Sequence, residues 1–183
     1  SSIAQIGYIT LGIGIATSAG IAAGFIHIGN HALIKGGLFM AVGGIFLATG
    51  SRVSVMSMTG IGRKMPLTAT AFLICGLSLI GLPLTAGFIS KLYLVRALLD
   101  NDNLVIVGWV LASSALSVMY LWKIVEVMWV RPAPVDALEI NERPALYIPL
   151  WIIAIANIWL GLDASWLVGA AEAAAASLLG AGG

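Results

Sequence analysis

Long apolar stretches, separated mostly by short groups of charged residues, form the main pattern along this chain. Ionisable side chains are costly inside a bilayer and collect in loops, so these groups mark the ends of membrane spans. Each apolar stretch is long enough for a helix to cross a hydrocarbon core of about 30 Å. The pattern predicts five spans, at residues 3–19, 23–49, 66–99, 104–130 and 144–162. We therefore expect an all-α, polytopic membrane helix bundle.

The stretch at residues 66–99 is too long for one straight span. As an unbroken helix it would extend about 51 Å. Gly81, Pro83 and Gly87 supply an interruption at residues 81–87, because proline removes a backbone donor and disfavours helix at the residue before it. Two short crossings, or one crossing by a discontinuous helix, would both fit. The loop before this stretch is basic and the loop after it is acidic, which favours opposite sides and one broken crossing.

The loop charges also predict a topology. Residues 50–65 carry Arg52, Arg63 and Lys64 without an acid, which predicts a cytoplasmic loop, and Asp100 and Asp102 are then outside. Residues 131–143 form a second cytoplasmic loop. The transmembrane bundle then occupies residues 1–163. The alanine-rich residues 164–183 suit an interfacial helix, a packing helix or a disordered end.

The composition excludes two other classes of protein, soluble domains and nucleic-acid-binding proteins. Of 183 residues 60% are apolar and 9% charged, with a net charge of +1, too few charges for a soluble domain and no positive excess for nucleic acid. The single cysteine, Cys75, can form neither an intrachain disulfide nor a cysteine-based metal cluster. The chain starts in apolar sequence without Met, which predicts a fragment or a split subunit.

The densest chemistry lies in the second predicted span. His27, His31 and Lys35 recur every four residues and so share one helical face, with Asn30 beside them as a hydrogen-bond partner. Imidazole exchanges protons near neutral pH, and a lysine in a low-dielectric interior can do so too, which predicts a proton relay. The alternatives are a packing histidine with a snorkelling lysine, or a metal site. No acid or cysteine in the neighbouring spans completes a metal site, and nothing in the sequence binds a flavin, quinone or iron–sulfur cluster, so we expect neither metal nor cofactor.

Lys91 is the second candidate, because it lies just after the predicted helix break. Broken helices in membranes face protein or water-filled cavities, where protons and ions bind. We therefore add Lys91 to the relay. Arg96 is nearer the membrane surface and is interpreted as a snorkelling anchor.

Weaker polar signals surround these residues. Ser113, Ser117 and Tyr120 form a stripe that either holds water or lets helices approach closely, and we favour the second interpretation. Lys123 and Glu126 are either a local ion pair, which we favour, or the exit of the hydrophilic path. Two polar residues of the first span are candidate contacts of the relay: Gln5 and Tyr8.

Four ordered blocks carry a family resemblance. They are Ser-Ser-Ile-Ala-Gln-Ile-Gly-Tyr at 1–8, His-Ile-Gly-Asn-His-Ala-Leu-Ile-Lys at 27–35, Gly-Arg-Lys-Met-Pro-Leu at 62–67 and Gly-Leu-Pro-Leu-Thr-Ala-Gly-Phe-Ile-Ser-Lys at 81–91. Together they resemble the antiporter-like subunits of respiratory complex I, membrane-bound hydrogenases and multisubunit Mrp-type cation/proton antiporters. The resemblance covers nearly all of residues 1–162 and implies the C-terminal half of such a subunit, the second of two inverted five-helix repeats.

The resemblance also implies roles and partners. His27, His31 and Lys35 look like central hydrophilic-axis residues, and Lys91 like the lysine at the discontinuous helix, where some members have Glu. Partners would be other membrane subunits, including the missing N-terminal half or a neighbouring antiporter-like subunit, together with protons, Na⁺ and lipid. The location would be a bacterial-type inner membrane, with any redox chemistry on partner subunits.

Residues 119–132 and 141–144 look most similar to the D-type subunits of Mrp antiporters, which predicts a proton-translocating subunit of a monovalent cation/proton antiporter. Pro-Leu-Thr-Ala-Gly-Phe at 83–88 is also common in complex I subunits. The alternative is therefore a proton-pumping subunit of complex I or a hydrogenase, and so a translocase component. A non-conducting membrane scaffold is a further alternative, although intramembrane charge argues against it.

Overall fold

The structure is a computed structural model that describes residues 1–50, 54–132 and 142–180. Within these ranges the chain is helical and contains no strand, which confirms the predicted all-α bundle. The elements are α1 (Ser2–Gly14), α2 (Ser18–Thr49), η1 (Met56–Met58), α3 (Ile61–Lys64), α4 (Pro66–Ile80), α5 (Ala86–Leu99), α6 (Leu104–Val125), η2 (Glu126–Val130), α7 (Pro144–Leu162) and α8 (Ser165–Gly180).

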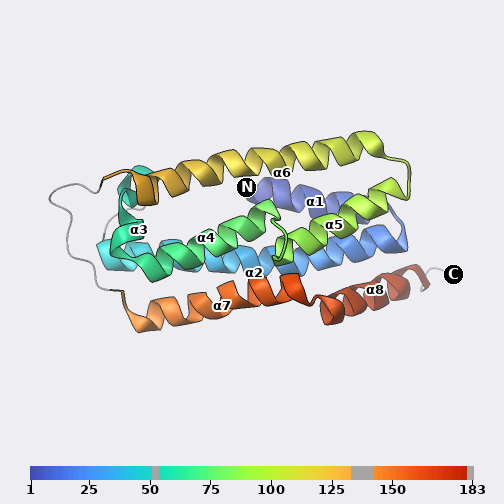
Figure 1. The fold of residues 1–183 in the computed structure, drawn as a ribbon. Coiled ribbons are helices and arrows are strands. Elements are labelled where there is room, and N and C mark those ends of the chain that lie inside the picture. The colour runs from blue at the N-terminus through green and yellow to red at the C-terminus, as the bar shows by residue number, and fades with distance from the viewer. Residues whose placement is uncertain (51–53, 133–141, 181–183) are drawn as a thin grey trace.

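α2 is the central helix of the bundle and contacts α1, α4, α5, α7 and α8 (Figure 1). It starts five residues before the predicted position because the Thr17 side chain accepts a hydrogen bond from the backbone N–H of Gly20 at 3.2 Å. It ends at Gly50, whose φ of 64° is the left-handed conformation that glycine adopts freely. Its 32 residues span the bundle, and its central part carries His27, His31 and Lys35 (Figure 1).

The predicted break is confirmed between α4 and α5. α4 ends at Gly81, with φ 90°, and the chain then turns through Pro83 and Leu84 before α5 begins at Ala86. Gly87 thus lies in the first turn of α5 rather than in the break. The two helices follow one another along the bundle, both against α2, with the break near the middle of its length (Figure 1).

Three helical segments of the described chain are long and apolar enough to cross a membrane: α2, residues Leu104–Val130 and α7. The segment Met56–Lys64 and α4, bent by 113° to each other, would make a fourth if counted as one span. α1 has only 13 residues, because Ala16 turns the chain with φ 56° and α2 starts soon after. Five crossings, with α4 and α5 as one of them, stay a prediction.

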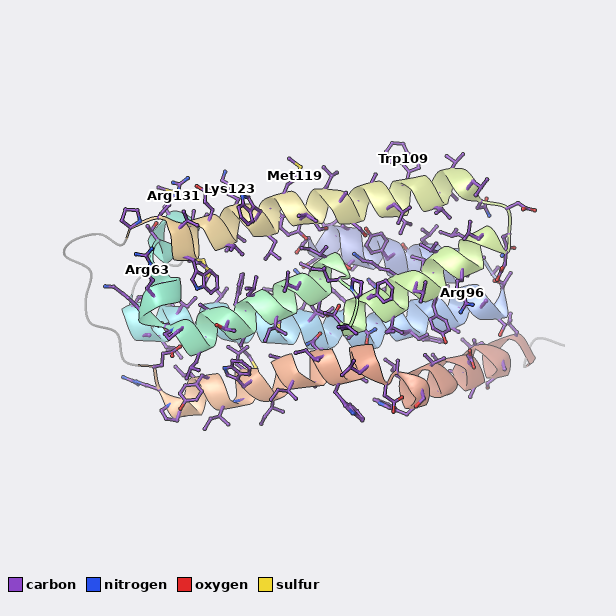
Figure 2. The ribbon with its side chains drawn as sticks, in the orientation of Figure 1. Arg63, Arg96, Trp109, Met119, Lys123 and Arg131 are labelled. Atoms are coloured by element: carbon purple, nitrogen blue, oxygen red, sulfur yellow. The ribbon has the colours of Figure 1, made fainter. Side chains whose placement is uncertain are left out.

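The charged ends of the bundle agree with the predicted loop positions. Arg63 and Arg131 lie at the same end, together with Lys123, whereas Arg96 lies towards the other end (Figure 2). Arg52 and residues 133–141 of the second predicted cytoplasmic loop lie outside the described residues. At the Arg63 end, the Glu142 carboxylate accepts hydrogen bonds from the N–H groups of Leu67 and Thr68 at 3.2 and 2.7 Å and so caps α4.

Two local expectations change. The predicted Lys123–Glu126 ion pair is wrong: Glu126 pairs with Arg131 at 3.2 Å, because the π-helical turn η2 brings Arg131 back over it. For the alanine-rich C-terminal segment, the structure shows a packing helix. Its Ala171 and Ala175 are buried against α2.

Candidate functional site

His27 lies between two polar side chains from other helices. Its Nδ1 is 2.8 Å from the Ser90 hydroxyl of α5, and its Nε2 is 3.0 Å from Oε1 of Gln5 in α1. All three residues are almost completely buried. An imidazole with both nitrogens hydrogen-bonded in a buried position is held in one orientation, so three helices together fix this ring.

Tyr8 connects His27 to Lys91. The Tyr8 ring meets the His27 ring edge to face, with centroids 5.5 Å apart, and the Lys91 ammonium lies 5.2 Å from the Tyr8 centroid. Tyr8 is buried and its hydroxyl contacts the Val110 carbonyl of α6 at 3.4 Å. Tyr8 had only a weak signal in the sequence, yet it stands between the two strongest candidates.

Lys91 occupies a position that the helix break creates. Its Nζ donates hydrogen bonds to the carbonyls of Ile80 at 2.7 Å and Leu79 at 3.2 Å, and to the Ser114 hydroxyl at 2.9 Å. The last carbonyls of a helix lack partners within the helix and carry partial negative charge. The C-terminal end of α4 therefore binds the ammonium group through backbone oxygens.

His31 and Lys35 continue along the face of α2 that carries His27. The His27 and His31 rings are parallel within 7°, with centroids 6.4 Å apart, and Nε2 of His31 is buried without a hydrogen-bond partner among the described residues. Lys35 is less buried, donates to the Ser1 hydroxyl at 2.6 Å and lies 5.7 Å from the Phe39 ring centroid. The structure thus brings Lys91, Tyr8, His27 and His31 into one series, with Lys35 one helical turn beyond.

A second group of buried polar residues holds the helix break. Gly87 N–H donates to the Ser78 hydroxyl at 3.1 Å, and that hydroxyl donates to Oδ1 of Asn157 in α7 at 2.9 Å. Asn30 donates to the Ala86 carbonyl at 2.6 Å and so contacts the break rather than the histidines. The ends of α4 and α5 are therefore fixed to α2 and α7.

The transmembrane family model of the NADH:quinone oxidoreductase/Mrp antiporters matches residues 1–117. The chain belongs to this family. It is 38% identical over 175 residues to NADH-quinone oxidoreductase subunit N of Desulforudis audaxviator, covering 88% of this chain and 35% of that protein. It is 34% identical over 122 residues to the D subunit of the Na(+)/H(+) antiporter of Alkalihalophilus pseudofirmus, and the match covers 67% of this chain and 24% of that subunit.

Solved structures agree with this family assignment. A chain of the Mrp complex from Dietzia sp. matches with a TM-score of 0.87 and 26% identity, covering 95% of this chain and 40% of that one. A chain of an archaeal membrane-bound sulfane sulfur reductase matches with a TM-score of 0.86 and 30% identity, and the match covers 96% of this chain and 35% of that one. This antiporter-like subunit is a multi-pass membrane protein, and the chain spans about a third of the length of the curated relatives it matches.

The structure separates the weaker candidates of this antiporter-like subunit from the series formed by Lys91, Tyr8, His27 and His31. Ser117 is buried and donates to the Ser113 carbonyl of its own helix. Tyr120 and Lys123 are exposed, and the hydroxyl of α6 that reaches Lys91 is instead that of Ser114. Trp109 and Met119 point away from the bundle on the opposite face of α6 (Figure 2).

Sequence reasoning missed five polar contacts or ranked them low. Gln5 had a weak signal, and Ser90 had only its position next to Lys91. The others are isolated polar residues within apolar stretches: Ser78, Ser114 and Asn157. Among the described residues, no group of three His, Cys, Asp or Glu side chains comes together.

Proposed function

We propose that this antiporter-like subunit moves protons across the membrane through the series Lys91, His27, His31 and Lys35, with Tyr8 between the first two. The observation that carries the proposal is Lys91, a buried lysine at a mid-bundle helix break, 5.2 Å from a Tyr8 ring that itself contacts His27. Buried ionisable groups in membrane spans are costly and are retained for ion or proton pathways.

The structure leaves space for water beside the lysine. A cavity of about 200 Å³ borders Lys91 and Ser114 between the helix break and α6. A water molecule occupies about 30 Å³, so the cavity has room for several. Waters there would exchange protons with Lys91 while its remaining donors stay on the α4 carbonyls.

For the assembly, we propose a redox-driven complex of the NADH-quinone oxidoreductase type. The match to the oxidoreductase subunit has 38% sequence identity and covers 88% of this chain. The match to the antiporter subunit has 34% identity and covers 67%. A cation/proton antiporter remains the second candidate, because the chain superposes on the Mrp complex over 95% of its length. Both assemblies would use the same proton series under a different driving force.

Proton translocation by the purified complex in proteoliposomes tests the first proposal. We expect Lys91→Ala to abolish uptake of protons measured with a pH-sensitive dye, whereas the exposed Arg96→Ala serves as the matched control and leaves it nearly unchanged. Lys91→Glu should retain partial activity, since a carboxyl group also exchanges protons. Normal transport by an assembled Lys91→Ala complex would refute the proposal.

The subunits that copurify with the chain test the second proposal. Water-soluble subunits with iron–sulfur clusters or flavin would support the redox-driven complex. Small membrane subunits alone, together with Na⁺-dependent proton exchange, would favour the antiporter and overturn it.

A further inference from the structure

The Ser90 hydroxyl lies between a ring nitrogen and a backbone carbonyl. Its Oγ is 2.8 Å from Nδ1 of His27 and 3.2 Å from the Gly87 carbonyl oxygen. A hydroxyl group has one donor and two acceptor positions, and its hydrogen turns freely to suit its neighbours. Ser90 is fully buried, so no bulk solvent competes for these positions.

On the other side of the ring, the Gln5 amide presents its oxygen. Oε1 lies 3.0 Å from Nε2 of His27 and accepts a hydrogen bond, so Nε2 carries the proton when the ring is neutral. Nδ1 is then unprotonated and accepts the hydrogen bond of Ser90. Both ring nitrogens are satisfied in this state.

The same atoms also satisfy the protonated ring. When Nδ1 gains a proton it donates to Ser90 Oγ, and the hydroxyl hydrogen turns to the Gly87 carbonyl. Nε2 continues to donate to Gln5. Only one hydroxyl hydrogen has to rotate, so gain or loss of a proton at His27 requires no movement of a heavy atom.

The opposite orientation of the Gln5 amide would not satisfy both the neutral and the protonated His27 ring. Its NH₂ group would then face Nε2, and with the protonated ring two donors would oppose each other. In the observed orientation, Nε2 of Gln5 is left without a partner among the described residues, which is the cost of presenting the oxygen. The orientation therefore favours a ring that changes its charge.

We infer that Gln5 and Ser90 are positioning residues that hold His27 as the Nε2–H tautomer, with Nδ1, facing α5, as the atom that gains and loses the proton. This inference rests on the proposed function. The other ionisable groups that face His27 are Tyr8 of α1, His31 of α2 and, across the Tyr8 ring, Lys91 of α5. Nδ1 faces the helix that carries Lys91.

Nitrogen-15 NMR of the complex labelled in histidine tests the tautomer directly. The difference from a His27→Gln complex isolates the His27 signals, and we expect the pattern of protonated Nε2 and bare Nδ1 in the neutral ring. Gln5→Leu removes the acceptor of Nε2 and should shift the population towards Nδ1–H, which can still donate to Ser90. A wild-type ring protonated at Nδ1, or a population unaltered by Gln5→Leu, would overturn the inference.

Transport provides the second readout. Ser90→Ala leaves the protonated ring without its acceptor at Nδ1, and we expect transport to fall roughly ten- to a hundredfold, with rescue by Ser90→Thr. Thr68→Val is the matched control, because it removes a buried hydroxyl that has no hydrogen-bond partner among the described residues, and should leave transport unchanged.

The two proposals fail separately. If His27→Gln and Lys91→Ala are inactive while Ser90→Ala transports normally, the relay stands and the positioning role is wrong. If His27→Gln transports normally, the proposed function is wrong even where the tautomer is as expected.

Discussion

Gly161, in the last turn of α7, packs directly on the backbone of the α4–α5 break. A Cβ atom at this position would collide with the peptide between Leu84 and Thr85. Backbone atoms yield less readily than the end of a flexible side chain. We therefore predict that Gly161→Ala destabilises the break itself.

The size of the effect follows from opposing contributions. Overpacking of this kind costs about 1–3 kcal/mol. The backbone of the break cannot easily move away from the added methyl group. Leu84 is already held at φ 70°, and the Thr85 hydroxyl donates to the Leu82 carbonyl at 2.6 Å. Alanine gains up to about 1 kcal/mol over glycine in a helix interior, but less at a helix end. The expected net loss is about 1–2 kcal/mol of unfolding free energy.

Gly108→Ala in α6 is the matched control, since nothing lies within 4 Å of its added Cβ. It should be neutral or stabilising. Unfolding of the detergent-solubilised complex, followed by tryptophan fluorescence, compares the two variants, and proton uptake in liposomes reports the effect on Lys91. Equal stability of the two variants would show that the break accommodates α7 freely, and the reasoning would be refuted.

Three further predictions follow from the structure. Cysteines placed at Ser54 and Asn101, both exposed, should be labelled from opposite sides of the membrane; labelling from one side would contradict a single broken crossing. Lys35→Arg should abolish proton transport, because guanidinium does not release its proton, and wild-type rates would show that Lys35 supplies only fixed charge. Asn157→Leu removes the acceptor of the buried Ser78 hydroxyl and should cost about 1–3 kcal/mol in unfolding free energy, whereas unchanged stability would mean that another group replaces it.

Local sequence rules predicted the helix break and the shared face of α2. Pro83 and the neighbouring glycines predicted the break because their effects on the backbone are local. The four-residue spacing predicted that His27, His31 and Lys35 share a face for the same reason. The prediction failed at Glu126, where a π-helical turn changed the spacing and replaced Lys123 by Arg131 as its partner.

The partners of the site residues depend on tertiary packing and could not be read from spacing. Ser90 and Gln5 are 63 and 22 positions from His27, and isolated polar residues in apolar spans have no pattern that pairs them. Spacing, the predicted break and the family resemblance identified the candidates but not the contacts between them. Lys91 was expected beside a break, yet two of the three acceptors it finds are backbone carbonyls, which every sequence has.

Those carbonyls make the charge on Lys91 part of the structure of the break. The protonated ammonium donates hydrogen bonds to the carbonyl oxygens of Leu79 and Ile80. These oxygens receive no hydrogen bond within α4, because the helix ends here. Any displacement that separates the two half-helices removes these acceptors and so weakens proton binding at Lys91. By thermodynamic reciprocity, loss of the proton loosens the break by the same free energy. A displacement of α7, which is joined to the break by the Ser78–Asn157 hydrogen bond, would therefore favour proton release from Lys91 if it opened the break, and proton uptake would favour closure.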